Sequence, residues 1–429
     1  MATLRDKLAT DLPRLRDEMK ALLKEHGEKV VSTVTLQQVF GGMRGVKSLL
    51  CDTSNVPADK GLIVRGKPIA DLTDRLPEEI FYLLLTGELP GEDAKRDLAD
   101  EFRERGVVPR YVWQVLEALP AGSHPMAMLS AAILSLEHES KFRRFYREGM
   151  GKDEYWEPML DDCLNLLAKL PGIAAYIYRL RFDKGPRIPG DSELDWGANF
   201  AKMLGIEDGD GRFTRLVRLY LVLHCDHEGG NVSALTTHTV GSALSDAYYA
   251  LSAGLNGLAG PLHGLANQEC LRWTLGLMHK FGGTPTKDQI MAYTRETLAD
   301  GKVIPGYGHA VLRVVDPRFT AFYEFGEKHC AGDPVFETVK VVFQAVPEVL
   351  KTVEKISNPW PNVDAVSGSL LWHFGMKEFS YYTVLFGVSR AMGVLSNLVI
   401  NRGVGGPIVR PKSITTELAR KLASEATAS

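Results

Sequence analysis

The chain has 429 residues, with 50 lysines and arginines against 53 aspartates and glutamates, so its formal net charge is -3. A chain of this length can bury a large core. Its nearly balanced charge gives no electrostatic reason to expect nucleic acid or a membrane surface as a partner. The five cysteines, at 51, 163, 225, 270 and 330, are widely separated and include no Cys-x-x-Cys pair. This usage is typical of reduced thiols in an intracellular protein.

Helical periodicity begins at the N-terminus. Apolar residues recur every three or four positions from residue 4 to residue 22, which predicts an amphipathic helix. Met1 to Glu25 has no secretory apolar core, and its acidic residues argue against an intact organellar targeting peptide. The chain is therefore expected to be a mature form, cytoplasmic if bacterial or, alternatively, in the mitochondrial matrix.

Most of the remaining chain also has helical patterns. Helices are predicted over residues 78–86, 93–105, 127–139, 156–169, 213–226, 233–255, 264–280, 287–299, 335–355 and 379–401. Only residues 30–34 and 62–64 have the composition of short strands. The predicted fold class is all-α.

The most apolar stretch, Tyr381 to Ile400, has nearly the length of a membrane span, but Arg390 stands at its middle. An arginine there costs at least ~2.5 kcal/mol in lipid, so a buried helix of a soluble protein is favoured. Its guanidinium then needs a buried anion. A ligand carboxylate and an internal Asp or Glu are both candidates.

No repeat or flexible linker divides the chain. Glycine-rich turns near 260–264 and 368–375 bracket one segment, which predicts a smaller helical domain inserted in a larger one. The expected division is a large domain of residues 1–264 and 376–429 and a small domain of residues 265–375. Ligand sites often lie at such joints.

Three separate turns rich in glycine or proline each carry a group that can transfer a proton: His263 after Gly260-Pro261-Leu262, His309 after Gly306-Tyr307-Gly308, and Asp364 after Pro361-Asn362-Val363. Glycine allows a backbone to approach a ligand closely. Two imidazoles and one carboxylate are suited to general acid and base catalysis. Arginines follow at 313, 318, 390 and 410, which favours a substrate with carboxylates or phosphates.

Each group also has a plainer interpretation. Pro261 near the first helical position places His263 in the first turn, where the helix dipole favours a neutral imidazole, but a histidine there can simply bond a backbone carbonyl. The turn before His309 can be an ordinary loop with solvent-facing basic residues. Asp364 can act as the N-cap of the run from Ala365 to Trp372.

His224, His227 and His238 were considered as metal ligands. His224 and His227 at i and i+3 can share a helical face, but the spacing is not that of His-Glu-x-x-His, and no third ligand can be assigned. No metal is expected. The chain also lacks a Gly-x-Gly-x-x-Gly turn after a strand and a P-loop, so no dinucleotide or triphosphate site is expected.

Taken together, the segments resemble the citrate synthase family, in the form typical of mitochondria and some bacteria. The resemblance rests on ordered motifs that cover nearly the whole chain: Gly41-Gly42-Met43-Arg44-Gly45, His227-Glu228-Gly229-Gly230-Asn231, Asn256-Gly257-Leu258-Ala259-Gly260-Pro261-Leu262-His263-Gly264, Pro305-Gly306-Tyr307-Gly308-His309-Ala310, Asn362-Val363-Asp364-Ala365, Phe386-Gly387-Val388-Ser389-Arg390 and Arg410-Pro411-Lys412-Ser413.

The resemblance implies a helical homodimer that condenses acetyl-CoA with oxaloacetate and hydrolyses the thioester to citrate and CoA. It implies Asp364 as the base, His263 as the group that stabilises the enolate, and His309 as the group that polarises the keto carbonyl. The oxaloacetate residues would be His227, Arg318, Arg390 and, from the partner subunit, Arg410. The CoA residues would be Arg44, Lys152 and Arg313. No cofactor is implied, because hydrogen bonds and arginines can stabilise the developing charge.

Two positions depart from the family pattern. Val366 stands where a histidine often follows the Asp-Ala pair, which leaves 2-methylcitrate synthase, acting on propionyl-CoA, as the alternative. Around the CoA phosphates, Lys152 replaces an arginine and Ser357 stands where a lysine is often found. A CoA- or carboxylate-binding protein without activity is disfavoured, because all three proton carriers are present.

Overall fold

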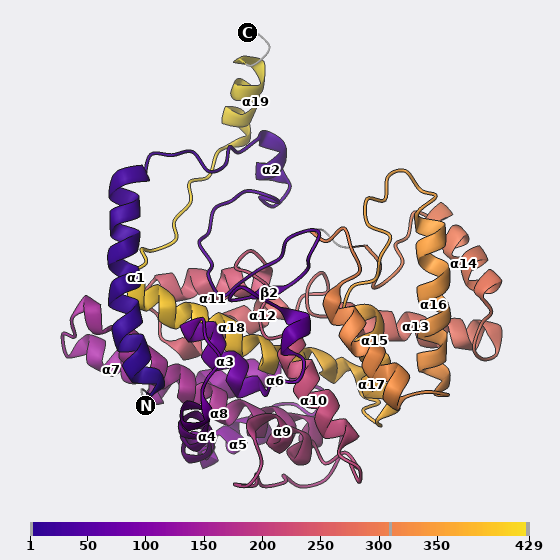
Figure 1. The fold of residues 1–429 in the computed structure, drawn as a ribbon, viewed down its shortest axis with the longest axis horizontal. Coiled ribbons are helices and arrows are strands. Elements are labelled where there is room, and N and C mark those ends of the chain that lie inside the picture. The colour runs from indigo at the N-terminus through magenta and orange to yellow at the C-terminus, as the bar shows by residue number, and fades with distance from the viewer. Residues whose placement is uncertain (1–2, 309–310, 426–429) are drawn as a thin grey trace.

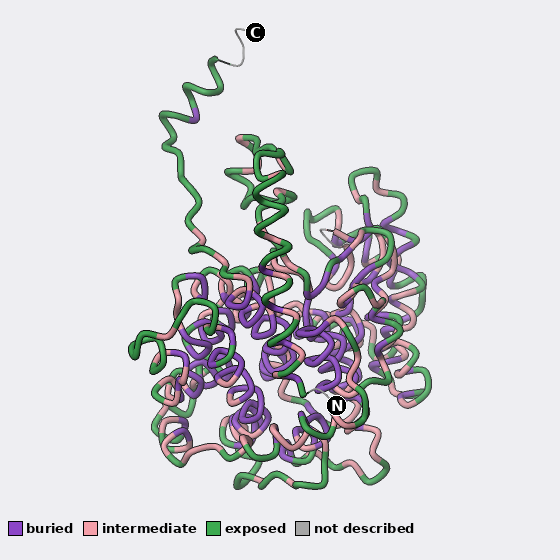
Figure 2. Tube along the Cα trace, turned by 60° about the vertical axis from the view of Figure 1, so that its left-hand side comes forward, coloured by how far each residue is buried: buried purple, intermediate pink, exposed green. Residues whose placement is uncertain are grey.

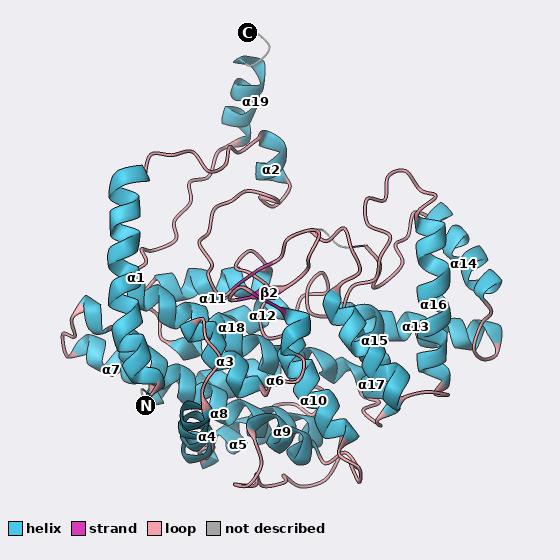
Figure 3. Ribbon diagram, viewed as in Figure 1, coloured by secondary structure: helices cyan, strands magenta, loops and turns pink. Residues whose placement is uncertain are grey.

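The computed structural model describes residues 3–308 and 311–425. Within them the chain is helical almost throughout (Figure 3), which confirms the all-α prediction. The helices are α1 (Leu4–His26), α2 (Leu36–Phe40), α3 (Pro77–Thr86), α4 (Glu92–Arg105), α5 (Arg110–Ala118), α6 (Pro125–Ser135), α7 (Lys141–Arg147), α8 (Trp156–Arg181), α9 (Trp196–Leu204), α10 (Arg212–Leu223), α11 (Val232–Ser242), α12 (Ala247–Leu258), α13 (Ala266–Phe281), α14 (Lys287–Ala299), α15 (Pro317–His329), α16 (Pro334–Leu350), α17 (Asp364–His373), α18 (Tyr382–Val404) and α19 (Thr416–Glu425).

Short 3-10 turns supplement these helices: η1 (Ile69–Leu72), η2 (Glu137–Glu139), η3 (Lys152–Glu154) and η4 (Phe379–Tyr381). Strands β1 (Ser54–Asn55), β2 (Ile63–Val64) and β3 (Lys67–Pro68) form a small antiparallel sheet in the order β1-β2-β3. The predicted strand at 62–64 is therefore confirmed. The predicted strand at 30–34 is wrong, because that segment is an exposed, irregular connection in which Val30 and Val31 face solvent.

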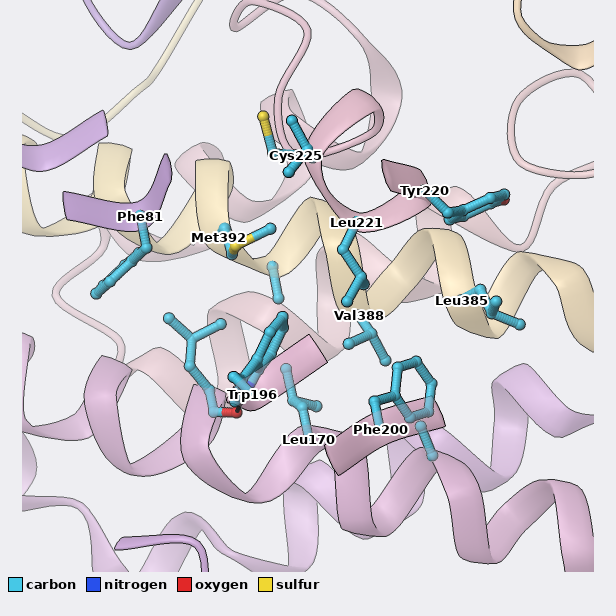
Figure 4. Close-up of a cluster of buried hydrophobic side chains, with 14 of the residues drawn as sticks. Phe81, Leu170, Trp196, Phe200, Tyr220, Leu221, Cys225, Leu385, Val388 and Met392 are labelled. Carbon is cyan, nitrogen blue, oxygen red and sulfur yellow. Dashed lines mark hydrogen bonds between the residues drawn. The ribbon is translucent and has the colours of Figure 1, made fainter. Parts of the chain in front are cut away.

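The core is organised around α18. Helices α3, α8, α10, α11 and α12 all pack against it, and the apolar part of residues Phe379–Val404 is 89% buried. Its length and composition would suffice for a membrane span, but its side chains lie in the protein core. Figure 4 shows Leu385, Val388 and Met392 of α18 among aromatic side chains of α9 and α10. The buried-helix prediction is confirmed.

Several predicted boundaries are wrong for local reasons. The single helix expected over 233–255 is divided into α11 and α12, since Leu244 adopts a positive φ of 64° and Asp246 caps α12 through the N–H groups of Tyr248 and Tyr249. The helix expected over 156–169 continues to Arg181, with Pro171 inside α8. Tertiary packing of a largely buried helix overrides the local effect of proline here.

Helices α13 to α17 lie together at one side of the molecule, coloured salmon to yellow-orange in Figure 1. Part of this group has its own apolar cluster, which includes Leu277, Ile290, Ile304, Val346 and Leu350 and is separate from the main core. Helices α15 and α17 also contact α10 of the main body. This arrangement is compatible with the division at 265–375, which stays a prediction.

The second half of α1, α2 and the segment after α18 project from the body, whereas the start of α1 packs against it (Figure 1). The first half of α1 is held by Leu4, Leu8 and Leu12, whereas Leu22 and Leu23 are 59% and 63% exposed. The predicted amphipathic stripe therefore packs on this chain only in its first turns. After α18, residues 405–415 run out to α19 as an exposed strand-like connection without helix (Figure 2).

Candidate active site

Arg390 is the central cation of the site. It lies on α18 with 2% exposure, and it donates from Nε to the His224 carbonyl (3.3 Å) and from Nη1 to Asn231 Oδ1 (3.1 Å) and Ser233 Oγ (3.4 Å). Burial lowers its pKa to about 10, so it remains charged at neutral pH. No carboxylate in the described residues forms an ion pair with it. Asp226 opposes the lowering of the Arg390 pKa through its charge without forming an ion pair, so a ligand carboxylate can still be the direct partner of the guanidinium.

His263 lies beside Arg390 and is held by Ser233. Its Nε2 accepts from the Ser233 backbone N–H at 3.2 Å and is 2.9 Å from Ser233 Oγ. Because a backbone N–H can only donate, Nε2 is unprotonated and the proton of a neutral ring is on Nδ1. Burial, and then Arg390, lower the pKa of His263 to about 4. The ring is thus a neutral Nδ1–H donor at physiological pH.

The predicted cause of that neutrality is wrong. Residues 260–265 form turns, and α13 begins only at Ala266, so His263 is not in the first turn of a helix. Desolvation and a neighbouring arginine lower the pKa instead of the helix dipole. The predicted outcome, a neutral imidazole that donates a hydrogen bond, is unchanged.

Arg318 is the second buried cation and has an internal partner. Asp316, which is fully buried, caps α15 and accepts from Arg318 Nε (3.0 Å) and Nη2 (2.7 Å). Asp316 thereby holds the guanidinium in one orientation, and the net effect of its charge is to raise the pKa of Arg318 despite burial. Nη1 of Arg318 has no hydrogen-bond partner in the described part of the chain, so it remains available to a substrate.

Asp364 is the first residue of α17, and its backbone N–H is bonded to Asn362 Oδ1 at 3.0 Å. Val363 holds the N-cap position without a side-chain bond, so the alternative that Asp364 is the N-cap is wrong. Burial raises the pKa of its carboxyl to about 6; Arg318 opposes this rise and Asp316 adds to it. The group is mainly ionised at pH 7 yet close to the pKa that suits a general base.

The turn before His309 is paired with the segment before Asp364. Asn362 N–H donates to the Gly306 carbonyl (2.9 Å), and Gly308 N–H donates to the Trp360 carbonyl (3.2 Å). Gly306 has a φ of +77°, and a Cβ there would lie 2.9 Å from Ala365 Cα, so only glycine permits this approach. His309 and Ala310 themselves lie outside the described residues.

The histidines near residue 227 occupy different positions. Helix α10 ends at Leu223, so His224 and His227 do not share a helical face as considered above. His224 is buried, stacks on Tyr220 and contacts its carbonyl through Nδ1 (3.1 Å), and burial lowers its pKa to about 3. His227 is half-buried beside Asn231. The described residues contain no group of three metal-ligating side chains, and the absence of a metal stays a prediction.

The remaining predicted residues lie apart from this cluster. Arg410 is exposed on the segment that leaves the body after α18. The three candidates for CoA are also exposed: Arg44 follows α2, Lys152 begins η3, and Arg313 precedes α15 with its N–H bonded to the Ala58 carbonyl (2.8 Å).

Three residues of the site were not singled out for it from the sequence. Ser233 fixes His263, Asn231 accepts from both Arg390 and the Ser233 hydroxyl (2.8 Å), and Asp316 fixes Arg318. The sequence marked two of them only as helix starts: Asn231 as the N-cap of α11, and Asp316 before Pro317 at the start of α15. A capping pattern alone gives no indication that the capping residue also serves a site.

Comparison with known proteins identifies the family of the chain. A family model described as "Citrate synthase, C-terminal domain" matches residues 42–412. The chain is 48% identical to "Probable citrate synthase, mitochondrial" of Glossina morsitans morsitans, over 98% of this chain and 92% of the relative. It is also 48% identical to "Citrate synthase, mitochondrial" of Saccharomyces cerevisiae, over 98% of this chain and 89% of the relative.

Solved structures give the same result for the fold. The crystal structure of citrate synthase from Pyrobaculum aerophilum matches with a TM-score of 0.80 and 29% identity, over 91% of this chain and 97% of that one. A ternary complex of carboxymethyl coenzyme A and oxaloacetate with citrate synthase from Thermoplasma acidophilum matches with a TM-score of 0.75 and 22% identity, over 90% of this chain and 97% of that one. The second likeness, at this identity, concerns the fold alone.

The fold is all-α, and its site places two buried arginines beside a neutral histidine and a buried carboxyl group. The match over most of the chain places it more closely: the chain belongs to the citrate synthase family, and it is an acyltransferase of the citrate synthase type.

Proposed function

We propose that this site joins the methyl carbon of acetyl-CoA to the keto carbon of oxaloacetate and hydrolyses the resulting thioester to citrate and CoA. The observation behind the proposal is that His263 is a neutral Nδ1–H donor next to Arg390. In the same cluster, Arg318 lies near the Asp364 carboxylate. Such a set can remove a carbon-bound proton and stabilise the oxyanion that forms.

Oxaloacetate, a dicarboxylate, is proposed to bind between Arg318 and Arg390, with His227 as a further donor. Arg318 and Arg390 are both buried, and Asp316 is the carboxylate that pairs directly with one of them, Arg318. The two guanidiniums therefore retain positive charge that a bound dianion can neutralise. Burial strengthens each charge-assisted hydrogen bond because little water competes.

In the proposed reaction, Asp364 takes a proton from the methyl group of acetyl-CoA, and the electron pair moves onto the thioester oxygen, which His263 Nδ1–H stabilises. The enolate carbon then attacks the keto carbon of oxaloacetate, whose oxygen takes a proton; His309 is the residue proposed to supply it. Water finally displaces CoA from the citryl thioester. These steps need no cofactor or metal, so chelation should leave turnover unchanged.

Closure of the 265–375 domain over bound oxaloacetate is proposed to complete the CoA side. The exposed positions of Arg44, Lys152 and Arg313 suit the phosphates of a CoA molecule that reaches out of the site. An enolate open to bulk water would be quenched, so substrate-driven closure favours the productive reaction.

A homodimer with Arg410 supplied in trans is proposed for the assembly. The projecting segments expose large apolar side chains in this single chain: Leu22, Leu23, Phe40, Ile408, Leu418 and Leu422 are each more than 40% exposed. In the proposed dimer these side chains contribute to one apolar patch, which is typical of an interface. Arg410 lies on one of these segments, outside the site of its own chain.

Both relatives quoted above are named mitochondrial, which supports the alternative location, the mitochondrial matrix, and gives no support to the first expectation of a cytoplasmic protein. Their names likewise support acetyl-CoA, and nothing favours 2-methylcitrate synthesis. Val366 is fully buried on α17, two residues after the base.

The experiment that tests the proposal is the release of free CoA thiol from acetyl-CoA and, separately, from propionyl-CoA, each with and without oxaloacetate. We expect CoA release to require oxaloacetate and to be faster with acetyl-CoA than with propionyl-CoA. Faster turnover of propionyl-CoA would contradict the acyl-donor assignment, and no release with either would contradict the activity.

A further inference from the structure

A cavity of about 700 Å³ lies far from the acid-base site, between α4, α5, α8, α9 and the segment before α9. None of the proposed substrate residues lines it. In Figure 1 these helices are at the bottom of the molecule, at the end opposite α2 and α19, which carry the surfaces proposed for the dimer. The volume falls in the range of pockets for small molecules, which is about 300–1,000 Å³.

The inner wall of this cavity contains a buried carboxyl group, Glu78, one of whose two oxygens has no hydrogen-bond partner in the described part of the chain, although backbone N–H groups of Glu78 and Trp196 interact with the carboxyl. Glu78, on α3, is 2% exposed, and its Oε2 has no hydrogen bond in the described residues. Phe102 and Trp196 line the same wall. An unpartnered buried oxygen of this kind costs about 1–3 kcal/mol, so its presence needs a reason.

Glu78 is not needed to hold its own helix. The start of α3 is already closed by Glu79, whose Oε2 accepts from the Leu76 backbone N–H at 2.8 Å. The other two carboxylates of the cavity are occupied: Asp191 pairs with Lys202, and Asp195 is bonded to Arg218 and to the Ala198 N–H at the start of α9. Oε2 of Glu78 is therefore the carboxylate oxygen on this wall that still lacks a donor within the described residues.

The outer rim of the cavity is basic and aromatic. Arg103, Arg110 and Arg187 line it and are exposed. The guanidinium of Arg187 lies over the Trp113 ring, 4.5 Å from its centroid. Arg110 forms no ion pair in the described residues. The cavity therefore has a hydrogen-bond acceptor at its inner end, apolar side chains along its walls and cations at its outer rim.

We propose that this cavity is a second ligand site, which binds a flat aromatic molecule with an N–H donor at one end and an anionic group at the other. The N–H would meet Glu78, the ring would lie between the apolar and aromatic side chains, and the anion would meet the arginines of the rim. Each chemical feature of the ligand has one counterpart in the cavity.

The probe that tests this site is indole-3-propionate, which carries a ring N–H and a carboxylate. For a molecule of about 14 non-hydrogen atoms, a Kd on the order of 1 mM is expected. Binding is measured by saturation-transfer NMR on the full-length protein, in the presence of saturating oxaloacetate and CoA. Two matched probes each remove one feature: 1-methylindole-3-propionate lacks the N–H, and indole-3-propionamide lacks the charge.

Both altered probes should bind about tenfold more weakly or not measurably, since each loses one polar contact. Glu78→Leu should abolish the difference between the indole and the 1-methylindole probe. Arg110→Ala, an exposed change, should weaken the carboxylate probe, whereas Arg147→Ala on α7, outside the cavity, should not. CoA release by each variant verifies that it is folded.

Absence of saturable binding at millimolar indole-3-propionate would overturn the proposal. Equal binding of the three probes, or displacement of the probe by oxaloacetate and CoA, would overturn it as well. If Glu78→Leu does not fold, Arg110→Ala and the probe series still decide the question.

Discussion

Substitution of Asp316 by asparagine tests how the site is assembled. Asp316 is fully buried. It accepts hydrogen bonds from Nε, Nη2 and the backbone N–H of Arg318, and from the Val363 N–H at 3.3 Å. It thus joins a substrate arginine to the segment that carries the base Asp364. An asparagine keeps the shape and the helix cap but removes the charge and turns one acceptor into a donor.

Two consequences are expected for Asp316→Asn. Removal of one partner of a buried ion pair costs about 3–5 kcal/mol of folding stability. With Arg318 no longer held, the KM for oxaloacetate should rise about tenfold or more, because a bidentate carboxylate contact depends on orientation.

The pH profile separates this role from a purely structural one. Asp364 must be ionised to act as a base, so the activity of the unaltered protein should fall as the pH drops through about 6, the raised pKa of this carboxyl. Asp316 contributes to that rise, and Arg318 opposes it. In Asp316→Asn the pKa of Asp364 should therefore be lower, and the acid limb of kcat/KM should move to lower pH.

The assay is oxaloacetate-dependent release of CoA thiol across the acid range, with thermal unfolding measured in parallel. Asp246→Asn is the matched control, since Asp246 is also a buried N-cap, on α12, but belongs to no substrate contact. It should leave the acid limb in place. An unchanged acid limb and KM in a folded Asp316→Asn protein would refute the reasoning.

Four further outcomes are expected. Asp364→Asn should lower kcat by roughly 10² to 10⁴ with oxaloacetate binding retained, as measured by CoA release and calorimetry; near-normal turnover would remove Asp364 as the base. His263→Ala should slow exchange of the acetyl methyl protons with deuterated solvent, and undiminished exchange would exclude its role at the enolate. Homodimers of Asp364→Ala and of Arg410→Ala should each be almost inactive, whereas mixed dimers should regain about half of the activity, as one intact site in two predicts; no recovery would place Arg410 in its own subunit's site. Burial raises the pKa of Glu78 to about 7 from 4.5, so ionisation of this carboxyl destabilises the fold progressively as the pH rises from 4.5 to 7. In thermal unfolding, Glu78→Gln should therefore be more stable than the unaltered protein by up to about 3 kcal/mol at pH 8 and should gain no stability below pH 4. An equal gain at both pH values would contradict the assignment.

The sequence predicted the parts of the fold that depend on periodicity. The apolar run around Arg390 predicted the buried helix α18, because a charge at its middle excludes lipid. Periodicity did not reveal the break between α11 and α12, which depends on the positive φ of Leu244 and on the cap at Asp246. It also failed at residues 30–34, where β-branched residues are not part of any sheet.

The same distinction holds for the site. The glycine and proline turns indicated His263 and Asp364, since such turns carry side chains to ligands. The residues that orient these groups, Ser233 and Asp316, come from other elements and are recognised only through contacts between distant segments. For His263 the neutral state was expected, but its cause, burial beside Arg390, depends on tertiary structure.

Condensation itself can be followed by NMR of the products formed from acetyl-CoA labelled in its methyl carbon and unlabelled oxaloacetate. The account predicts that the label appears in a methylene carbon of citrate and that CoA is released in equal amount, because a carbon–carbon bond forms before the thioester is hydrolysed. Release of CoA with the label in free acetate would show a thioesterase without condensation and would contradict the account.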